Sequence, residues 1–306
     1  GAVRGHPHVM TPRVRLAVTL GDPRGIGPEI VRKALADARV RAACDPIVVG
    51  PEGTGTPVDA SVGHWSSTST EADAGRFSGL AIAHAVELAA AGTVQGIVTA
   101  PIDKHALLAG GYDYPGHTEM LAELTGRPVA MMLASDKLRV VLATTHIALR
   151  DVPTALTADA FRRAFEVTRA GLRDQFGIAE PRLALCALNP HAGDGGRFGT
   201  EDDLLLAPVA RECGMAGPFP ADTVFVRAMR GEFDAVIAPY HDVGMTAIKV
   251  ASFGSAVNVT LGLPFPRTSP DHGTALDIAG QDRADPSSMI AAMQVACSMV
   301  VRTARA

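Results

Sequence analysis

Short apolar runs rich in β-branched residues alternate with helical stretches along this 306-residue chain. Residues 14–20, 45–50 and 96–101 have the composition of buried strands, and residues 28–37 and 78–92 between them have helical spacing. Strands that alternate with helices form parallel sheets, so this order predicts an α/β protein with a mainly parallel sheet. The pattern continues with strands expected at 138–146, 182–190, 234–241 and 256–264, and with helices at 157–177 and 286–304.

Composition and charge exclude two classes of partner. A net charge of −4 and an aromatic content of 5% leave neither a basic face nor stacking residues for nucleic acid. No apolar run is long enough to span a membrane, so no membrane partner is expected either. The four widely separated cysteines include no C-x-x-C pair, which is typical of thiols in a reducing compartment. We therefore expect a cytoplasmic protein.

Three histidines, His146, His191 and His241, each follow an apolar strand candidate. Ligands gather at the carboxyl ends of parallel strands, so the loops that carry these histidines should converge with the segment 99–104. Imidazole is a common ligand of metals such as zinc, and three protein ligands plus an open position are typical of a catalytic site. Hydrogen bonds within its own loop are the better explanation for one isolated histidine. Three at equivalent strand ends favour a metal site.

Two cations flank a very apolar segment, residues 250–266. Lys249 precedes it and Arg267 follows it, and a charge beside a buried segment tends to have a partner. An anionic substrate could be that partner, because arginine is suited to phosphate or carboxylate. The alternative is that these cations are simply exposed to solvent, as single cations on a protein usually are. His117, in PGHTEM, is expected in a polar loop that could face a ligand.

The segment GDPRGIGPEI (21–30) joins a strand to a helix but matches neither the G-x-G-x-x-G nor the G-x-x-x-x-G-K-[ST] pattern. It is either a tight turn that needs glycine or part of a nicotinamide site of a different kind. No cofactor-binding residue is assigned from it.

Several motifs together carry a family resemblance. GDPRGIGPEI, TAPIDK, GHTEML, ATTHIALRDVP, NPHAGDGGRFGTED, YHDVGMTAIK and TLGLPFPRTSPDHGTA occur in this order. Over roughly residues 14–300 the chain closely resembles the 4-hydroxythreonine-4-phosphate dehydrogenase family, with a segment at 45–75 that is shorter than the family leads us to expect.

The resemblance implies a fold like that of isocitrate and isopropylmalate dehydrogenases, in which two α/β/α domains enclose a central cleft. The expected domains are 10–115 plus 260–306 and 116–259. It also implies a homodimer with a shared active site. The implied reaction is NAD- or NADP-dependent oxidation of 4-phosphooxy-L-threonine to 2-amino-3-oxo-4-phosphooxybutanoate, which decarboxylates to 3-amino-2-oxopropyl phosphate in pyridoxal phosphate biosynthesis.

The resemblance also implies roles for individual residues. The divalent metal (zinc, magnesium, manganese or cobalt) is expected on His146, His191 and His241, with the first two from one subunit and His241 from its partner. Lys249 and His117 are the expected catalytic residues. The small phosphorylated substrate is expected to contact His117, Thr118, Lys249, Asn258 and Arg267.

Other activities remain open at the level of the sequence. Relatives within this class oxidise phosphorylated threonate or erythronate, or aromatic cis-dihydrodiol acids. Acyl-phosphate transferases of similar fold form an alternative of another class, without a three-histidine metal site. A metal-binding protein without activity would leave Lys249, Asn258 and Arg267 unexplained.

Overall fold

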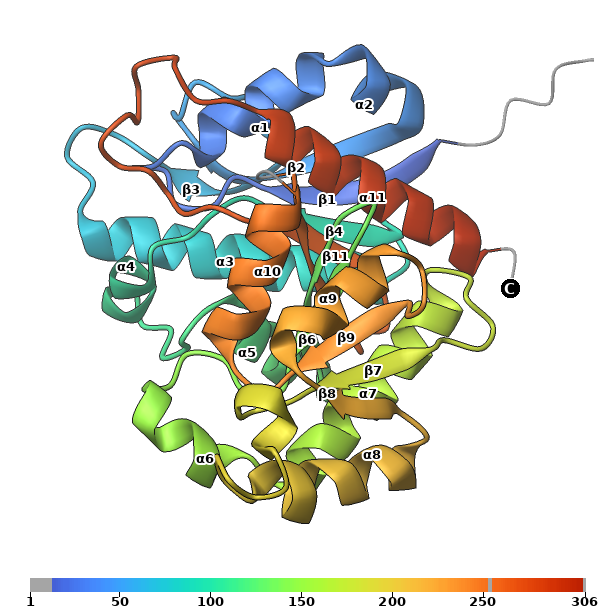
Figure 1. The fold of residues 1–306 in the computed structure, drawn as a ribbon. Helices are drawn as coiled ribbons and strands as arrows, with labels where there is room; N and C mark the ends of the chain where they lie inside the picture. The colour runs from blue at the N-terminus through green and yellow to red at the C-terminus, as the bar shows by residue number, and fades with distance from the viewer. Residues whose placement is uncertain (1–12, 253–254, 305–306) are drawn as a thin grey trace, which may run out of the picture.

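The structure, a computed structural model, describes residues 13–252 and 255–304. Its strands form a single sheet in the order β3-β2-β1-β4-β11-β10-β5-β6-β9-β7-β8 (Figure 1). The strands are β1 (Val14–Thr19), β2 (Cys44–Glu52), β3 (Ala60–His64), β4 (Gly96–Thr99), β5 (Ala130–Ala134), β6 (Arg139–Leu142), β7 (Leu183–Cys186), β8 (Ala216–Phe219), β9 (Ala235–Ala238), β10 (Val257–Leu261) and β11 (Arg267–Pro270).

Helices connect these strands and cover both faces of the sheet (Figure 1). They are α1 (Gly27–Ala36), α2 (Ala38–Ala43), α3 (Glu71–Ala90), α4 (Lys104–Ala109), α5 (His117–Thr125), α6 (Val152–Ala155), α7 (Ala158–Asp174), α8 (Ala207–Cys213), α9 (Ala221–Met229), α10 (His241–Ser252) and α11 (Ser287–Thr303), with short turns η1 (Leu149–Asp151), η2 (Pro190–Gly193) and η3 (Asp202–Leu206).

The sheet consists of two parallel halves joined by antiparallel strands. Strands β3, β2, β1, β4 and β11 run parallel to one another, and so do β6, β9, β7 and β8. Between them, β10 is antiparallel to both β11 and β5, and β5 is antiparallel to β6. The chain is therefore an α/β protein, as predicted. Its middle strands depart from the parallel arrangement because the chain returns from the second half to the first through β10 and β11.

Alternate residues of the strands pack against different helical layers. In β1, Leu16 and Val18 belong to the core beneath α1 and α11, whereas Ala17 packs on the opposite face beneath α3. In β5, Met132 lies on the α7 and α11 face, and Leu133 lies on the face covered by α10. This alternation of period two produces three layers, with helices on either side of the sheet.

The predicted strands and helices are present with shifted ends, but some elements were not predicted. The segment RTSP forms β11 although it is polar, because it is buried between β4 and β10. The segment 53–75 contains β3 and the start of α3, neither of which was predicted there. The expected domain boundary at residues 259 and 260 falls inside β10, and the strands of both expected domains belong to one continuous sheet. The division into 10–115 plus 260–306 and 116–259 therefore stays a prediction.

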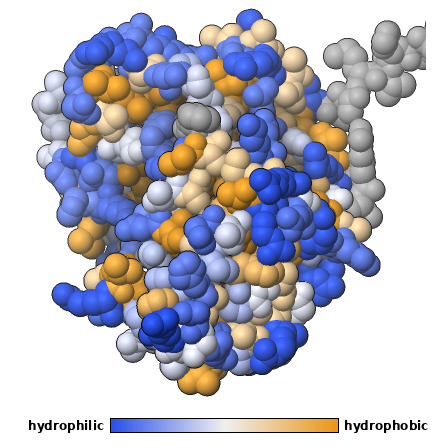
Figure 2. Space-filling model, viewed as in Figure 1, coloured by the Kyte–Doolittle hydropathy of each residue, from blue (hydrophilic) through white to orange (hydrophobic). Residues whose placement is uncertain are grey.

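The surface in Figure 2 is mainly hydrophilic, with hydrophobic residues in separate groups. In the described part of the chain, no helix is both long and apolar enough to cross a bilayer. Large hydrophobic side chains are nevertheless exposed on the segments that follow β6 and β7, namely Ile147, Leu149, Phe198 and Leu204.

Candidate functional site

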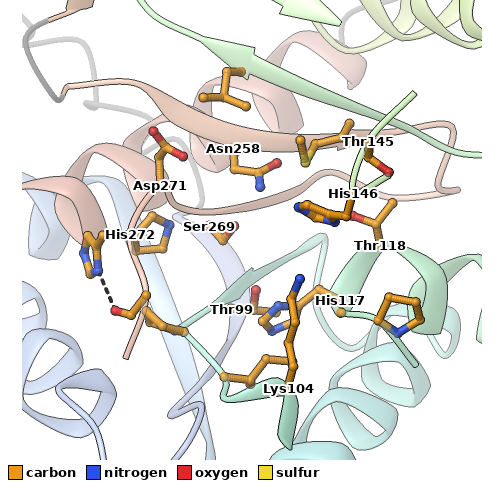
Figure 3. Close-up of a pocket in the computed structure, with 18 of the residues that line it drawn as sticks. Thr99, Lys104, His117, Thr118, Thr145, His146, Asn258, Ser269, Asp271 and His272 are labelled. Carbon is orange, nitrogen blue, oxygen red and sulfur yellow. Dashed lines mark hydrogen bonds between the residues drawn. The ribbon is translucent and has the colours of Figure 1, made fainter. Parts of the chain in front are cut away.

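A cavity of about 370 Å³ lies where the two halves of the sheet meet, beside the carboxyl end of β4. Figure 3 shows Asn258 and Asp271 on one side of it and His117 and Lys104 on the other. Because β4, α5, β10 and β11 all contribute, segments far apart in the sequence form one site. Its polar lining consists of Thr99, Lys104, His117, Thr118, Glu119, Thr145, His146, His241, Lys249, Asn258, Arg267, Ser269, Asp271 and His272.

Arg267, at the start of β11, is a buried cation with 1% of its surface exposed. Its guanidinium donates hydrogen bonds to the hydroxyl oxygens of Thr99 on β4 and Thr260 on β10. Among the described residues no carboxylate forms an ion pair with it, and its Nε lacks a hydrogen-bond partner. Burial lowers the pKa of Arg267 to about 9, so the group stays charged at neutral pH. A buried charge without a counterion calls for an anion, and this one lines the cavity.

Two further buried atoms in the cavity wall lack partners in the described part of the chain. They are Nε2 of His117 and Oδ1 of Asn258. Burial, and next the charge of Arg267, lowers the pKa of His117 well below 6.5, so its imidazole is neutral at neutral pH. An unpaired buried polar atom is costly, which makes these atoms candidate contacts for a polar ligand. The structure places His117 and Thr118 in the first turn of α5, rather than in the expected loop.

Asp271, for which no role was predicted, lies beside Lys249. Its Oδ2 is 3.4 Å from Nζ of Lys249, and the lysine side chain is about half exposed at the cavity. Burial raises the pKa of Asp271, and the charge of Lys249 opposes this shift. The only sequence signal for Asp271 was its place before His272 in the motif PDHGTA. The pair supplies a proton donor and a proton acceptor at the cavity wall.

Two of the three expected metal ligands lie together. The ring centroids of His146 and His241 are 5.5 Å apart, and both residues line the cavity. Burial, then the charges of Lys104 and His241, lower the pKa of His146, which favours the neutral imidazole that a metal requires. Nδ1 of His241 is 2.7 Å from a carboxylate oxygen of Asp242, which leaves Nε2 as the nitrogen able to bind a metal.

His191 lines a neighbouring pocket with Asp222 and Tyr240 instead of the main cavity. Three of the four strand-end loops therefore converge as expected, and the fourth does not. Among the residues that the structure describes, no three His, Cys, Asp or Glu side chains come close enough to hold a metal. Within this chain His241 is the neighbour of His146, and the expected assignment of His146 and His191 to one subunit stays a prediction.

The loop that carries His191 has an unusual and well-supported backbone. His191 and Ala192 have φ values of 53° and 55°, in the left-handed region that side chains rarely adopt. The buried carboxylate of Asp202 accepts hydrogen bonds from the backbone N–H groups of Leu188 and Asn189, at 2.8 and 3.0 Å. Conformations of this kind persist only where the surrounding structure enforces them, so the loop presents His191 in a fixed orientation.

Comparison with known proteins gives a consistent result. The family model described as pyridoxal phosphate biosynthetic protein PdxA matches residues 29–296. A 4-hydroxythreonine-4-phosphate dehydrogenase from a Ruegeria species is 45% identical, over 93% of this chain and 96% of the relative. A Bradyrhizobium diazoefficiens protein, named as a candidate D-threonate 4-phosphate dehydrogenase, is 42% identical, over 94% of this chain and 96% of the relative.

Solved structures extend the comparison to the fold. The 4-hydroxythreonine-4-phosphate dehydrogenase from Klebsiella pneumoniae has a TM-score of 0.82 at 37% identity, covering 94% of this chain and 98% of that one. An isocitrate dehydrogenase from Methylococcus capsulatus has a TM-score of 0.54 at 15% identity, covering 95% of this chain and 87% of that one. At so low an identity the second likeness concerns the fold alone.

The environment of His117 predicts a dependence of stability on pH. Its pKa is lower in the folded chain, so the unfolded chain binds more protons as the pH falls below about 6.5, and stability then falls by up to about 1.4 kcal/mol per pH unit. We expect His117→Asn to lose this part of the slope. Urea unfolding between about pH 7.5 and pH 5 measures it. His105→Asn, an exposed histidine outside the cavity, is the control. Equal slopes for wild type and His117→Asn would contradict the neutral buried imidazole.

Proposed function

The chain belongs to the family of the pyridoxal phosphate biosynthetic protein PdxA, and on that premise we propose that it oxidises 4-hydroxythreonine 4-phosphate with a nicotinamide cofactor. The secondary alcohol gives up a hydride to NAD or NADP and a proton to the protein. The resulting β-keto acid, 2-amino-3-oxo-4-phosphooxybutanoate, then loses carbon dioxide to give 3-amino-2-oxopropyl phosphate.

The observation that carries this proposal is the buried, unpaired charge of Arg267. A phosphate group in the cavity would supply the missing anion, and its oxygens would accept hydrogen bonds from the guanidinium. The unpartnered atoms of His117 and Asn258 would then contact polar groups elsewhere on the same substrate. The ion pair of Lys249 with Asp271 lies where it could orient the substrate hydroxyl and carry its proton.

The cavity also bears on which phosphorylated substrate is used. The carboxylates of Glu119 and Asp271 line it together with the cations. An ammonium group, which 4-phosphooxy-threonine carries and 4-phospho-threonate lacks, would find acceptors there. The D-threonate 4-phosphate relative is nearly as similar in sequence as the others, so phosphothreonate oxidation is the second candidate function.

A divalent metal fits the site only in part. His146 and His241 offer two imidazoles, and a third ligand is needed for a catalytic site. When bound, such a cation supplies Lewis-acid stabilisation of negative charge on the substrate oxygen. We propose zinc, magnesium, manganese or cobalt in this role, with the third imidazole from His191 of a second subunit.

Exposed hydrophobic side chains support a homodimer. Ile147 and Leu149, close in sequence to His146, are 43% and 66% exposed, and Phe198 and Leu204, in the loop region after His191, are 46% and 74% exposed. Apolar surface next to an incomplete ligand set is the arrangement expected where a twofold-related copy covers both.

The direct test follows the reduction of NAD and of NADP with three substrates: 4-phosphooxy-threonine, 4-phospho-threonate and an aromatic cis-dihydrodiol acid. We expect the highest kcat/KM with the first, together with release of carbon dioxide. Exhaustive chelation should stop turnover, and added zinc, magnesium, manganese or cobalt should restore it. Preference for 4-phospho-threonate would establish the second candidate instead, and full activity without metal would refute the metal requirement.

Arg267→Met tests the phosphate contact. We expect the phosphorylated substrate to bind more weakly by about 1.5–3 kcal/mol, the range for a hydrogen bond to a charged group, and the unphosphorylated analogue to be much less affected. Titration calorimetry gives both affinities. The control is Arg127→Met, because Arg127 is exposed and does not line the cavity. Equal losses for the two ligands would assign Arg267 a structural role or a contact with the cofactor.

Subunit mixing tests the shared metal site. If His146 and His241 act from one chain and His191 from the other, a mixed dimer of His146→Ala and His191→Ala has one intact site. Random pairing makes about half of the dimers mixed, so about a quarter of wild-type activity should return. The mixture of His146→Ala with His241→Ala should stay inactive. Activity from that second mixture alone would support the partition implied by the resemblance, with His146 and His191 from one subunit and His241 from its partner. If neither mixture is active after subunit exchange, all three ligands come from one chain.

A further inference from the structure

A second cavity, of about 550 Å³, lies behind the strands that form the wall of the first. Neighbouring residues of a strand point to opposite faces of the sheet. Thus Leu133 of β5 and Asn258 of β10 line the first cavity, whereas Ala134 and Val257 line the second. The rear cavity is closed by the end of α7 and by α11, and so lies between helices of the two halves of the sheet.

Two arginines give this rear cavity a positive charge. Arg139, on β6, donates a hydrogen bond to the backbone carbonyl of Asp234 and lies 5.3 Å from the ring centre of Phe176. Arg302, on α11, donates to the backbone carbonyl of Phe176. Within residues 13–252 and 255–304, neither guanidinium forms an ion pair with a carboxylate. The carboxylate of Asp234, whose charge acts on Arg139, is bound by Arg182 at 3.1 Å.

Two buried polar atoms in the lining of the rear cavity have no hydrogen-bond partner in the described part of the chain. The side chain of Gln175 is 7% exposed, and its Oε1 has no hydrogen-bond partner among the described residues. The same holds for Nε of Arg139. Burial lowers the pKa of Arg139, the carboxylate of Asp234 opposes this, and the charge of Arg302 adds to it. Among the described residues, therefore, neither arginine is paired with an anion, and Oε1 of Gln175 has no hydrogen-bond donor.

We propose that the rear cavity binds a small organic phosphate that also carries a hydroxyl or amino group, and that this ligand is an effector of the main cavity. A phosphomonoester has a charge of about −1.5 to −2 at neutral pH. This charge balances two guanidinium groups more fully than the single charge of a carboxylate would. Its hydroxyl or amino group would donate to Gln175, and its phosphate would contact Arg139 and Arg302. Asp136, the only acid in the described lining, is exposed at the rim.

The shared strands explain how the ligand could act at a distance. β5 and β10 separate the two cavities, so a shift of either strand on one side moves Leu133 or Asn258 on the other. The ligand would also link β6 of one half to α11, which packs on the strands of the other half. If the ligand binds one relative arrangement of the two halves more tightly than another, it stabilises that arrangement by the difference in binding free energy.

Calorimetry with glycerol 3-phosphate tests the binding, with glycerol and inorganic phosphate as matched ligands. We expect the double variant Arg139→Gln/Arg302→Gln to bind glycerol 3-phosphate at least about tenfold more weakly at one site, the scale of a charged hydrogen bond. Binding at the main cavity is common to both proteins and cancels in the comparison. Lys137→Gln is the control for surface charge, since Lys137 is exposed and lies outside the rear cavity. Either single arginine variant, checked by thermal melting, replaces a double variant that does not fold.

Gln175→Met separates a ligand site from a structural defect. Removal of an unpaired buried acceptor should raise the melting temperature of the free protein, while the affinity for glycerol 3-phosphate falls.

In turnover assays glycerol 3-phosphate should change kcat of wild type and leave that of the double arginine variant unchanged. Identical isotherms for wild type and the double variant, or equal losses in Lys137→Gln, would overturn the site. Binding without any effect on kcat would overturn the effector role, and the calorimetry needs no assumption about the proposed reaction.

Discussion

The guanidinium of Arg267 connects β4, β11 and β10, the adjacent strands through which the two halves of the sheet are joined. It extends from β11 to hydroxyl groups on both neighbouring strands, Thr99 on β4 and Thr260 on β10, in the part of the sheet where the two halves join. The same group lines the main cavity and has no carboxylate partner among the residues that the structure describes. A buried cation of this kind costs stability unless an anion neutralises it, so the site and the join between the halves share one electrostatic requirement. Substrate phosphate would satisfy it.

The architecture determines where chemistry can gather. Parallel strands direct their carboxyl ends to one edge within each half, and the main cavity is lined by segments that follow β4 in the first half and β6 and β9 in the second. His146 and His241 follow the adjacent strands β6 and β9, and this explains why their rings approach to 5.5 Å. His191 follows β7, the next strand along, and its loop bends away to a neighbouring pocket. Strand order thus accounts for the close pair, whereas His191 lies on a loop with left-handed φ values that lines another pocket.

Sequence alone predicted the α/β class, most of the regular elements and the residues Lys249, Asn258 and Arg267 in one cavity. These follow from periodicity and from motifs, which are local properties. It did not predict β11, whose polar residues are buried by neighbours distant in the chain, or the pairing of Lys249 with Asp271, which depends on the packing of α10 beside the segment after β11. Nor could spacing of 45 or 50 residues indicate which two histidines would meet, because that depends on the order of strands in the sheet.

The incomplete histidine set has a physical consequence for assembly. Two imidazoles bind a metal far more weakly than three, so a chain with only His146 and His241 in place gains its full affinity when a third ligand arrives. If His191 of another copy is that ligand, metal binding and dimer formation stabilise each other, and each raises the apparent affinity of the other by the same factor. The exposed Leu149 and Leu204, on the segments after β6 and β7, would be buried in the same step. Apolar burial and metal coordination would then favour the same dimer, whose formation completes the site.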